Sequence, residues 1–161
     1  MATKEQILDY LQEVFDPEVP VLSVVDLGIV RKIEIDAEGT HITITPTYTG
    51  CPAMNVIEED IRAKMKEKGI SSFDIKTILS PAWTTDWISE EGKQKLKDYG
   101  IAPPEKSSPD KGLLSNHAKV LKCPRCGSMN TEMKSFFGST ACKSLYVCND
   151  CKEPFDYFKC L

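Results

Sequence analysis

Two closely spaced pairs of cysteines near the C-terminus constrain the fold of this chain more than any other feature. The motif CPRC covers residues 123–126, and the motif CNDC covers residues 148–151. Two residues between cysteines allow a tight turn to direct both sulfurs at one metal ion, and two such turns complete a tetrahedron. The spacing therefore predicts one metal site with four thiolate ligands. The predicted ligands are Cys123, Cys126, Cys148 and Cys151.

A site of this composition is predicted to be structural. Protein sulfurs fill all four tetrahedral positions, so none is left for a reacting water. A segment of about 40 residues rarely folds on an apolar core alone, and a metal ion supplies the missing stability. Zinc is the ion that we expect, but four thiolates also suit a rubredoxin-like iron or an iron–sulfur centre. The sequence leaves zinc and iron open, and only iron would allow electron transfer.

The cysteine count and the N-terminus indicate a protein of a reducing compartment. Seven cysteines are an odd number, which fits a disulfide framework poorly. The first residues, MATKEQILDYLQEVF, lack the apolar core of a secretory signal, and no apolar run approaches the roughly 20 residues that cross a bilayer. We therefore expect a cytoplasmic protein without membrane contact. Cys142 is interpreted either as a small buried residue or as a redox or ligand residue, and Cys160 is given no role.

Charge is distributed unevenly along the chain. Residues 1–118 carry 13 Lys and Arg against 20 Asp and Glu, a formal charge of −7, whereas residues 119–161 carry 7 against 4, a formal charge of +3. A divalent ion bound by four thiolates lowers the second value by two. The C-terminal segment then has no large basic face, so we expect no binding of nucleic acid, which requires phosphate charges to be neutralised.

The N-terminal part of the chain predicts alternating helices and strands. Thr3 and Gln6 form a capping-box pattern, and the apolar spacing that follows predicts a helix that ends at Asp16-Pro17. Alternation of apolar and polar residues predicts a hairpin, then a second helix and a third strand. The ranges after the first helix are strands at 29–36 and 41–48, a helix at 52–68, a strand at 73–79, and a helix that Ser89 caps and that ends near residue 100. Gly69 is expected to end the helix at 52–68 in a left-handed conformation.

This order of elements predicts an α+β fold. We expect a compact domain with a three-stranded mixed sheet over residues 1–100, followed by a small four-cysteine, zinc-ribbon-like domain over residues 120–161. Residues 101–119 combine Pro, Ser and charged residues, which is typical of an exposed linker.

Cys51 stands apart from the other cysteines, in the segment TPTYTGCPAMNVIEED at residues 45–60. The predicted helix starts with Pro52, which puts Cys51 at or next to the helix N-terminus. Unpaired backbone N–H groups and the helix dipole favour a thiolate at such positions, and the thiolate is the form that binds metal. Cys51 is therefore a candidate reactive thiol, with the hydroxyl of Thr49 close by in sequence. The alternative is that Cys51 is a buried apolar residue beneath the hairpin.

Three acidic residues are candidates for the surroundings of Cys51. Asp16, Glu18 and Asp26 lie in the loop-like stretch between the first helix and the first strand. Carboxylates beside a thiolate disfavour it unless a cation joins them, so this grouping favours transient binding of a metal ion or a cluster. The alternative is that these acidic residues form turns and caps.

Nothing in the sequence indicates catalysis by this chain alone. The two histidines, His41 and His117, are poorly placed to act as the base of a Cys–His hydrolase. The chain holds no pair of Glu-x-x-His motifs for a di-iron site and no Gly-rich nucleotide motif. Trp83 and Trp87 flank the residues TTD and suit either the core or a surface for a partner.

Two groups of motifs resemble known families. DPEVPVLSVVDLGIV and TPTYTGCPAMNVIEEDI resemble the SufT-like family, which consists of small α+β domains of iron–sulfur protein maturation. SPAWTTDWISEEGKQKLKDYGIAPP, together with CPRCGS, FGSTACKSLYVC and EPFDYFKC, resembles the D subunits of bacterial phenylacetyl-CoA epoxidase systems, with their C-terminal zinc ribbon. The second resemblance extends over almost the whole chain.

The resemblance implies an accessory role in aerobic phenylacetate degradation. In such systems a di-iron oxygenase with a flavin and iron–sulfur reductase carries out the epoxidation, and the D component assists maturation of the complex. The implied partners are these oxygenase and reductase components, and the implied cofactors are structural zinc and a transient iron or iron–sulfur cluster. The family's acidic loop falls on Asp16, Glu18 and Asp26, its threonine-glycine-cysteine turn falls on Thr49, Gly50 and Cys51, and its ribbon ligands fall on the four cysteines of the tail.

Three functions fit the sequence. The preferred one is a maturation factor in which Cys51 transiently holds iron or a cluster while the ribbon docks onto the recipient protein. The second is a rubredoxin-like electron-transfer subunit with iron bound by the four cysteines. The third is a structural scaffold of the oxygenase complex.

Overall fold

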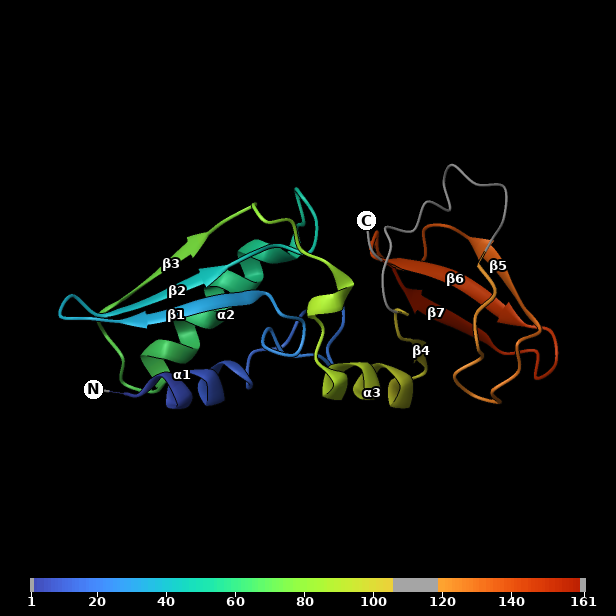
Figure 1. Cartoon of the computed structure of the whole chain (residues 1–161), viewed down its shortest axis with the longest axis horizontal. Helices are drawn as coiled ribbons and strands as arrows, with labels where there is room; N and C mark the ends of the chain where they lie inside the picture. The colour runs from blue at the N-terminus through green and yellow to red at the C-terminus, as the bar shows by residue number, and fades with distance from the viewer. Residues whose placement is uncertain (1, 106–118, 160–161) are drawn as a thin grey trace. The chain divides into compact units, whose positions relative to one another are not determined.

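The computed structural model describes residues 2–105 and 119–159. The chain divides into two compact units, residues 1–92 and 93–161, and each has its own sheet (Figure 1). A 3-10 helix, Thr85–Trp87, lies near the end of the first unit. Within the described residues, no helix combines the length and the apolar character that crossing a membrane requires.

The first unit is built on a mixed sheet of three strands in the order β1-β2-β3. β1 (Val30–Ile35) and β2 (Thr40–Ile44) form the predicted antiparallel hairpin, and β3 (Phe73–Thr77) pairs with β2 in parallel. Parallel pairing requires a crossover connection, which α2 (Ala53–Glu67) provides. The prediction of an α+β fold with a three-stranded mixed sheet is therefore confirmed.

α1 (Lys4–Leu11) begins as predicted but ends earlier. The Thr3 hydroxyl accepts the backbone N–H of Gln6, and the Gln6 side chain accepts the backbone N–H of Thr3, so the capping box forms. The prediction that this helix continues to Asp16 was wrong. The backbone N–H of Asp16 donates instead to the carbonyl of Leu22 at 3.0 Å, because the chain folds back on itself after the helix.

The core of the first unit lies between one face of the sheet and the two helices. Alternate residues of β2 are buried, as expected for a strand with one covered face. α2 is followed by Gly69, whose φ of 78° is the left-handed conformation predicted for the end of this helix. The buried side chains of these elements include Ile7 and Leu11 of α1, Ile42 and Ile44 of β2, and Ile57, Ile61 and Met65 of α2.

The second unit contains a sheet of four strands in the order β4-β7-β6-β5. β5 (Thr131–Ser135), β6 (Lys143–Cys148) and β7 (Pro154–Phe158) pair antiparallel in chain order. β4 (Ile101–Ala102) adds to β7 in parallel at the edge of this sheet. The second C-x-x-C motif lies at the turn between β6 and β7, and the first lies just before β5.

The division between the units differs from the expected domain boundaries. α3 (Glu90–Tyr99), which Ser89 caps through its side chain as predicted, spans the division. Ile101 and Ala102, which were expected to begin the linker, are buried and form β4. Their place in the sheet depends on pairing with a strand far along the chain, which local composition does not reveal. The part of the expected linker from 106 to 118 lies outside the described residues.

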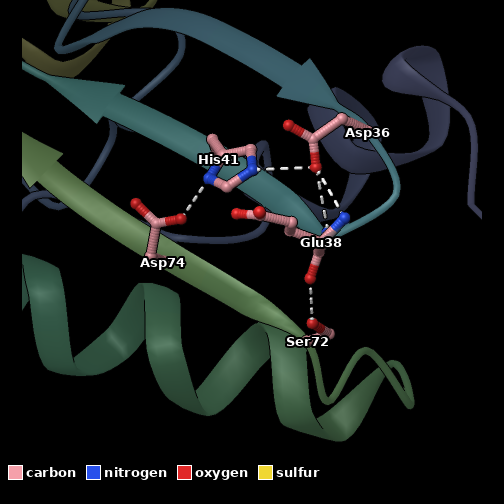
Figure 2. A network of polar contacts seen from close by, with 6 residues as sticks. Asp36, Glu38, His41, Ser72 and Asp74 are labelled. Atoms are coloured by element: carbon pink, nitrogen blue, oxygen red, sulfur yellow. Dashed lines mark hydrogen bonds and ion pairs between the residues drawn. The ribbon is translucent and has the colours of Figure 1, made fainter.

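A polar network joins the three strands of the first unit near the β1–β2 turn (Figure 2). His41 of β2 lies between Asp36 and Asp74; its Nε2 is 3.1 Å from Asp36 Oδ1, and its Nδ1 contacts a carboxylate oxygen of Asp74. Asp36 also accepts the backbone N–H of Glu38, and Ser72 Oγ donates to the Glu38 carbonyl. The hydrogen bonds to Asp36 and then to Asp74 raise the pKa of His41 above its ordinary value.

This raised pKa predicts that His41 stabilises the first unit in a pH-dependent way. A histidine with a higher pKa in the folded state contributes fully below its unfolded value of about 6.5, and the contribution is lost as pH rises through the folded value. Wild type should therefore exceed His41→Gln in free energy of unfolding by more at about pH 6 than at about pH 9. Urea unfolding followed by the fluorescence of Trp83 and Trp87, both in the first unit, measures this difference. The same difference at both pH values would contradict the prediction.

Candidate metal centre and the Cys51 turn

The four predicted metal ligands converge in the second unit. Their Sγ atoms all lie within 4.8 Å of one another. Cys123 Sγ is 3.8 Å from Cys151 Sγ, and Cys126 Sγ is 3.6 Å from Cys148 Sγ. A tetrahedron with metal–sulfur bonds of about 2.3 Å has edges of about 3.8 Å. The spacing therefore fits a single ion bound by all four sulfurs, with no position left for a reacting ligand.

Two similar backbone turns direct these sulfurs at one point. Gly127 follows the first pair with a φ of 77°, and its N–H donates to the Cys123 carbonyl at 2.9 Å. Lys152 follows the second pair with a φ of 64°, and its N–H donates to the Cys148 carbonyl, also at 2.9 Å. A left-handed residue after each C-x-x-C motif thus closes both turns in the same way.

The sulfur site is continuous with the core of the second unit. Cys123 and Cys148 are buried in one cluster, whereas Cys126 is exposed. The backbone N–H of Cys151 is the main cause that lowers the pKa of Cys148 to about 7. The backbone N–H of Glu153 lowers the pKa of Cys151, but burial and the neighbouring thiols outweigh it and raise the value to about 12. Neighbouring thiols thus differ in how readily they lose their protons. A metal ion that replaces these protons can bind all four sulfurs as thiolates, so the donor set suits a metal. The cluster also includes Ala102, Leu121, Tyr146, Phe155 and Tyr157.

Cys51 lies directly before the residue that caps α2, which is Pro52. The carbonyl of Cys51 accepts the backbone N–H of Met54 at 3.2 Å. The cysteine is only 9% exposed, and Thr47 Oγ1 lies 4.0 Å from its sulfur. Thr49, on the same turn, is exposed. Cys51 thus lies at the start of α2, as predicted, and its side chain is largely buried, as the alternative interpretation expected.

The two aspartates of the predicted acidic loop make the contacts of turn and cap residues. Asp16 Oδ1 accepts the backbone N–H groups of Glu18 and Val19 at 2.7 and 3.0 Å. Asp26 Oδ2 accepts the backbone N–H of Ser23 at 3.2 Å. Among the described residues, the four-cysteine site is the one group of three or more cysteine, histidine or acidic side chains that could hold a metal ion. The acidic loop therefore does not form a second group of that kind with the thiol before α2.

Sequence reasoning missed how the segment with the two tryptophans is held. Trp83 Nε1 donates to the Leu27 carbonyl at 2.8 Å, and the Arg31 guanidinium lies 3.4 Å from the centre of the Trp87 ring. Gly28 has a φ of 69°, and a Cβ at this position would lie 2.5 Å from the Trp87 carbonyl oxygen. The glycine just before the first strand was the available signal, because glycine permits such a close backbone approach.

Replacing Gly28 with alanine should therefore destabilise the first unit. We expect a loss of at least about 2 kcal/mol, because the left-handed backbone costs about 1–2 kcal/mol and the methyl group also meets the Trp87 carbonyl. Gly69→Ala is the matched control, since its φ is 78° and its Cβ would meet nothing within 4 Å. Urea unfolding with tryptophan fluorescence should show the larger loss for Gly28→Ala. Equal losses in the two variants would exclude the close contact as the cause.

Comparison with protein families identifies two kinds of module. The family model described as an iron-sulfur cluster assembly protein matches residues 4–70. The family model described as the PaaD zinc beta ribbon domain matches residues 107–159, which include all four ligand cysteines. The fold and the four-cysteine site thus define a protein that joins a domain of the iron–sulfur assembly type to a zinc ribbon.

One relative extends over nearly the whole chain. It is the candidate D subunit of the 1,2-phenylacetyl-CoA epoxidase of Escherichia coli strain K12. The two proteins are 45% identical over 156 residues, which are 97% of this chain and 92% of the relative. The chain therefore belongs to the family of phenylacetyl-CoA epoxidase D subunits, as its motifs indicated.

Shorter proteins match part of the chain. SufT of Staphylococcus aureus strain USA300, an Fe-S protein maturation auxiliary factor, is 33% identical over 52% of this chain and 96% of its own length. A solved domain of unknown function from Bacillus anthracis has a TM-score of 0.55 at 25% identity, covering 58% of this chain and 90% of that one. A conserved hypothetical protein from Thermotoga maritima has a TM-score of 0.51 at 32% identity, covering 59% and 94%.

Proposed function

We propose that this protein is an accessory maturation factor for the multicomponent phenylacetyl-CoA epoxidase, and not the oxygenating subunit. In this role it assists assembly of an iron–sulfur or other metal centre in a partner protein of the cytoplasm. One observation carries the proposal: a domain similar to iron–sulfur maturation factors and a closed four-thiolate site occur together in a chain of the D-subunit family.

We assign Cys51 to binding the metal or cluster in transit. Every other cysteine of the chain follows residue 120, so Cys51 is the thiol that the first domain offers to a soft metal. It lies directly before the residue that caps α2. Its low exposure limits contact of the sulfur with bulk solvent. We assign Asp16 and Asp26 to holding the loop, because their carboxylates accept backbone N–H groups of that loop.

We propose that the four cysteines of the ribbon bind zinc in a structural role. Zinc bound by four thiolates has no redox chemistry, and the ion links separate turns of a small domain. The stabilised ribbon would then dock onto an oxygenase or reductase component of the epoxidase. An iron-loaded ribbon would point instead to electron transfer.

The test of the Cys51 assignment is replacement by serine, with the partner oxygenase components produced in the same cells. Cys51→Ser should fold and retain its ribbon metal, because the ribbon ligands lie in the other unit. The partner components should contain less iron and show lower epoxidase activity than those made with wild type. Cys142→Ser is the matched control, since Cys142 is also buried but belongs to the second unit and is not among the four ligands. Full iron content in partners made with Cys51→Ser would remove the thiol from the proposed role.

Elemental analysis and a visible spectrum of protein purified without oxygen separate maturation from electron transfer. The proposal predicts a colourless ribbon with one zinc per chain. Stoichiometric iron with the absorption of a four-thiolate centre would favour the electron-transfer role instead.

A further inference from the structure

The two metal-binding turns are joined by side-chain hydrogen bonds that do not involve the sulfurs. Asp150 lies within the second C-x-x-C motif, and Ser128 and Asn130 follow the first. Ser128 Oγ donates to Asp150 Oδ2, and Asn130 Nδ2 donates to Asp150 Oδ1 at 2.8 Å. One carboxylate thus holds two residues of the opposite turn. We call Ser128, Asn130 and Asp150 the knuckle clasp.

Backbone hydrogen bonds connect the knuckle clasp to the ligand segments on both sides. The Ser128 carbonyl accepts the N–H of the ligand Cys123 at 2.8 Å, and Ser128 Oγ accepts the N–H of Asn130 at 3.0 Å. On the other side, the N–H of Asn149 donates to the Asn130 carbonyl at 2.8 Å. Because Asn149 and Asp150 are the two residues between the second pair of ligands, a shift of the clasp would move that pair relative to the first.

Electrostatic attraction to the metal site does not explain a carboxylate at position 150. Four thiolates around a divalent ion carry a formal charge of −2, so a nearby carboxylate is repelled. A carboxylate is favoured here as an acceptor, because it takes two donors at once and because charge-assisted hydrogen bonds are about twice as strong as neutral ones. The hydrogen bonds to Ser128 and Asn130 therefore account for a carboxylate at position 150, and attraction to the metal site does not.

We propose that Asp150 is a positioning residue for the four-cysteine site: through Ser128 and Asn130 it fixes the distance between the two turns and so slows loss of the bound ion. The β5–β6 ladder begins where Thr131 pairs with Cys148. Its strand pairing therefore aligns the two turns only at the end where they join the strands. The knuckle clasp holds the turns beyond the end of this ladder. Outer hydrogen bonds of this kind commonly change metal affinity by about 10–100-fold.

The test measures zinc retention in the full-length, zinc-loaded protein against a chromophoric chelator. Asp150→Ala should lose zinc about 10–100-fold more readily than wild type. Asp150→Asn keeps an acceptor oxygen for Asn130 and an amide donor for Ser128, so it should retain zinc nearly as well as wild type. Glu132→Gln is the matched control, because it removes an exposed β5 carboxylate that pairs with Lys134 rather than with the turns.

Two further measurements separate positioning from a general loss of structure. Asp150→Ala loaded with cobalt(II) should show the absorption of a tetrahedral four-thiolate ion, because all four ligands remain. The double variant Ser128→Ala with Asp150→Ala should lose little more zinc affinity than Asp150→Ala alone, since both changes remove the same contact.

Several outcomes would overturn the proposal. Wild-type zinc retention in Asp150→Ala would do so, as would an equal loss in Glu132→Gln. Equal losses in Asp150→Asn and Asp150→Ala would assign the effect to charge instead of hydrogen bonding. If Asp150→Ala does not fold, Ser128→Ala decides the question, because it keeps the carboxylate and removes the bond from Ser128 Oγ to it, together with the bond from the Asn130 N–H to Ser128 Oγ. Unchanged zinc retention in that variant would contradict the proposal.

Discussion

The structure of the second unit depends on four cysteine sulfurs that meet at one point. Cys123 and Cys148 are ligands and also members of the apolar core, so the metal site and the core are a single structure. Thiolates 3.6 to 3.8 Å apart repel one another unless a cation lies between them. We therefore expect a bound metal ion to stabilise this unit, and the two turns on which the sulfurs lie must be held in register for the ion to stay bound.

The two units divide the proposed function between them. The first has the fold found in iron–sulfur maturation factors and places one cysteine, Cys51, at the start of a helix. The second supplies a metal site in which protein sulfurs fill all four positions, the composition of a structural rather than a catalytic site. The low exposure of Cys51 reduces its susceptibility to oxidation, and the proposed role requires that its sulfur become accessible without unfolding. In the proposed role, contact with a client protein would complete the metal-binding environment, because among the described residues no further ligand group joins Cys51.

The parts of the fold and site that the sequence predicted correctly rest on neighbours within about one turn of chain. The capping box at Thr3 and the left-handed Gly69 are such features, whereas the convergence of the two C-x-x-C motifs was predicted from the four ligands that a tetrahedral ion requires. The parts that it missed rest on distant partners. Ala102 joins a sheet through a strand near the C-terminus, and Gly28 is required by a tryptophan carbonyl far along the chain. The acidic loop was grouped with the thiol from its position along the chain, and the structure shows that its aspartates accept backbone N–H groups from within three residues. The degree of exposure of a residue before a helix also depends on tertiary packing, which periodicity does not describe.

The most direct measurement of the central claim is the alkylation rate of Cys51 in the folded, metal-loaded protein, followed without oxygen by mass spectrometry of the cysteine peptides. Cys142, which is 5% exposed, serves as the internal reference for a buried thiol. If Cys51 carries metal, it will react faster than Cys142 while the protein stays folded, and ferrous iron will slow that reaction. Modification of Cys51 only at the rate of unfolding, with no protection by iron, would contradict the role of this thiol in metal transfer.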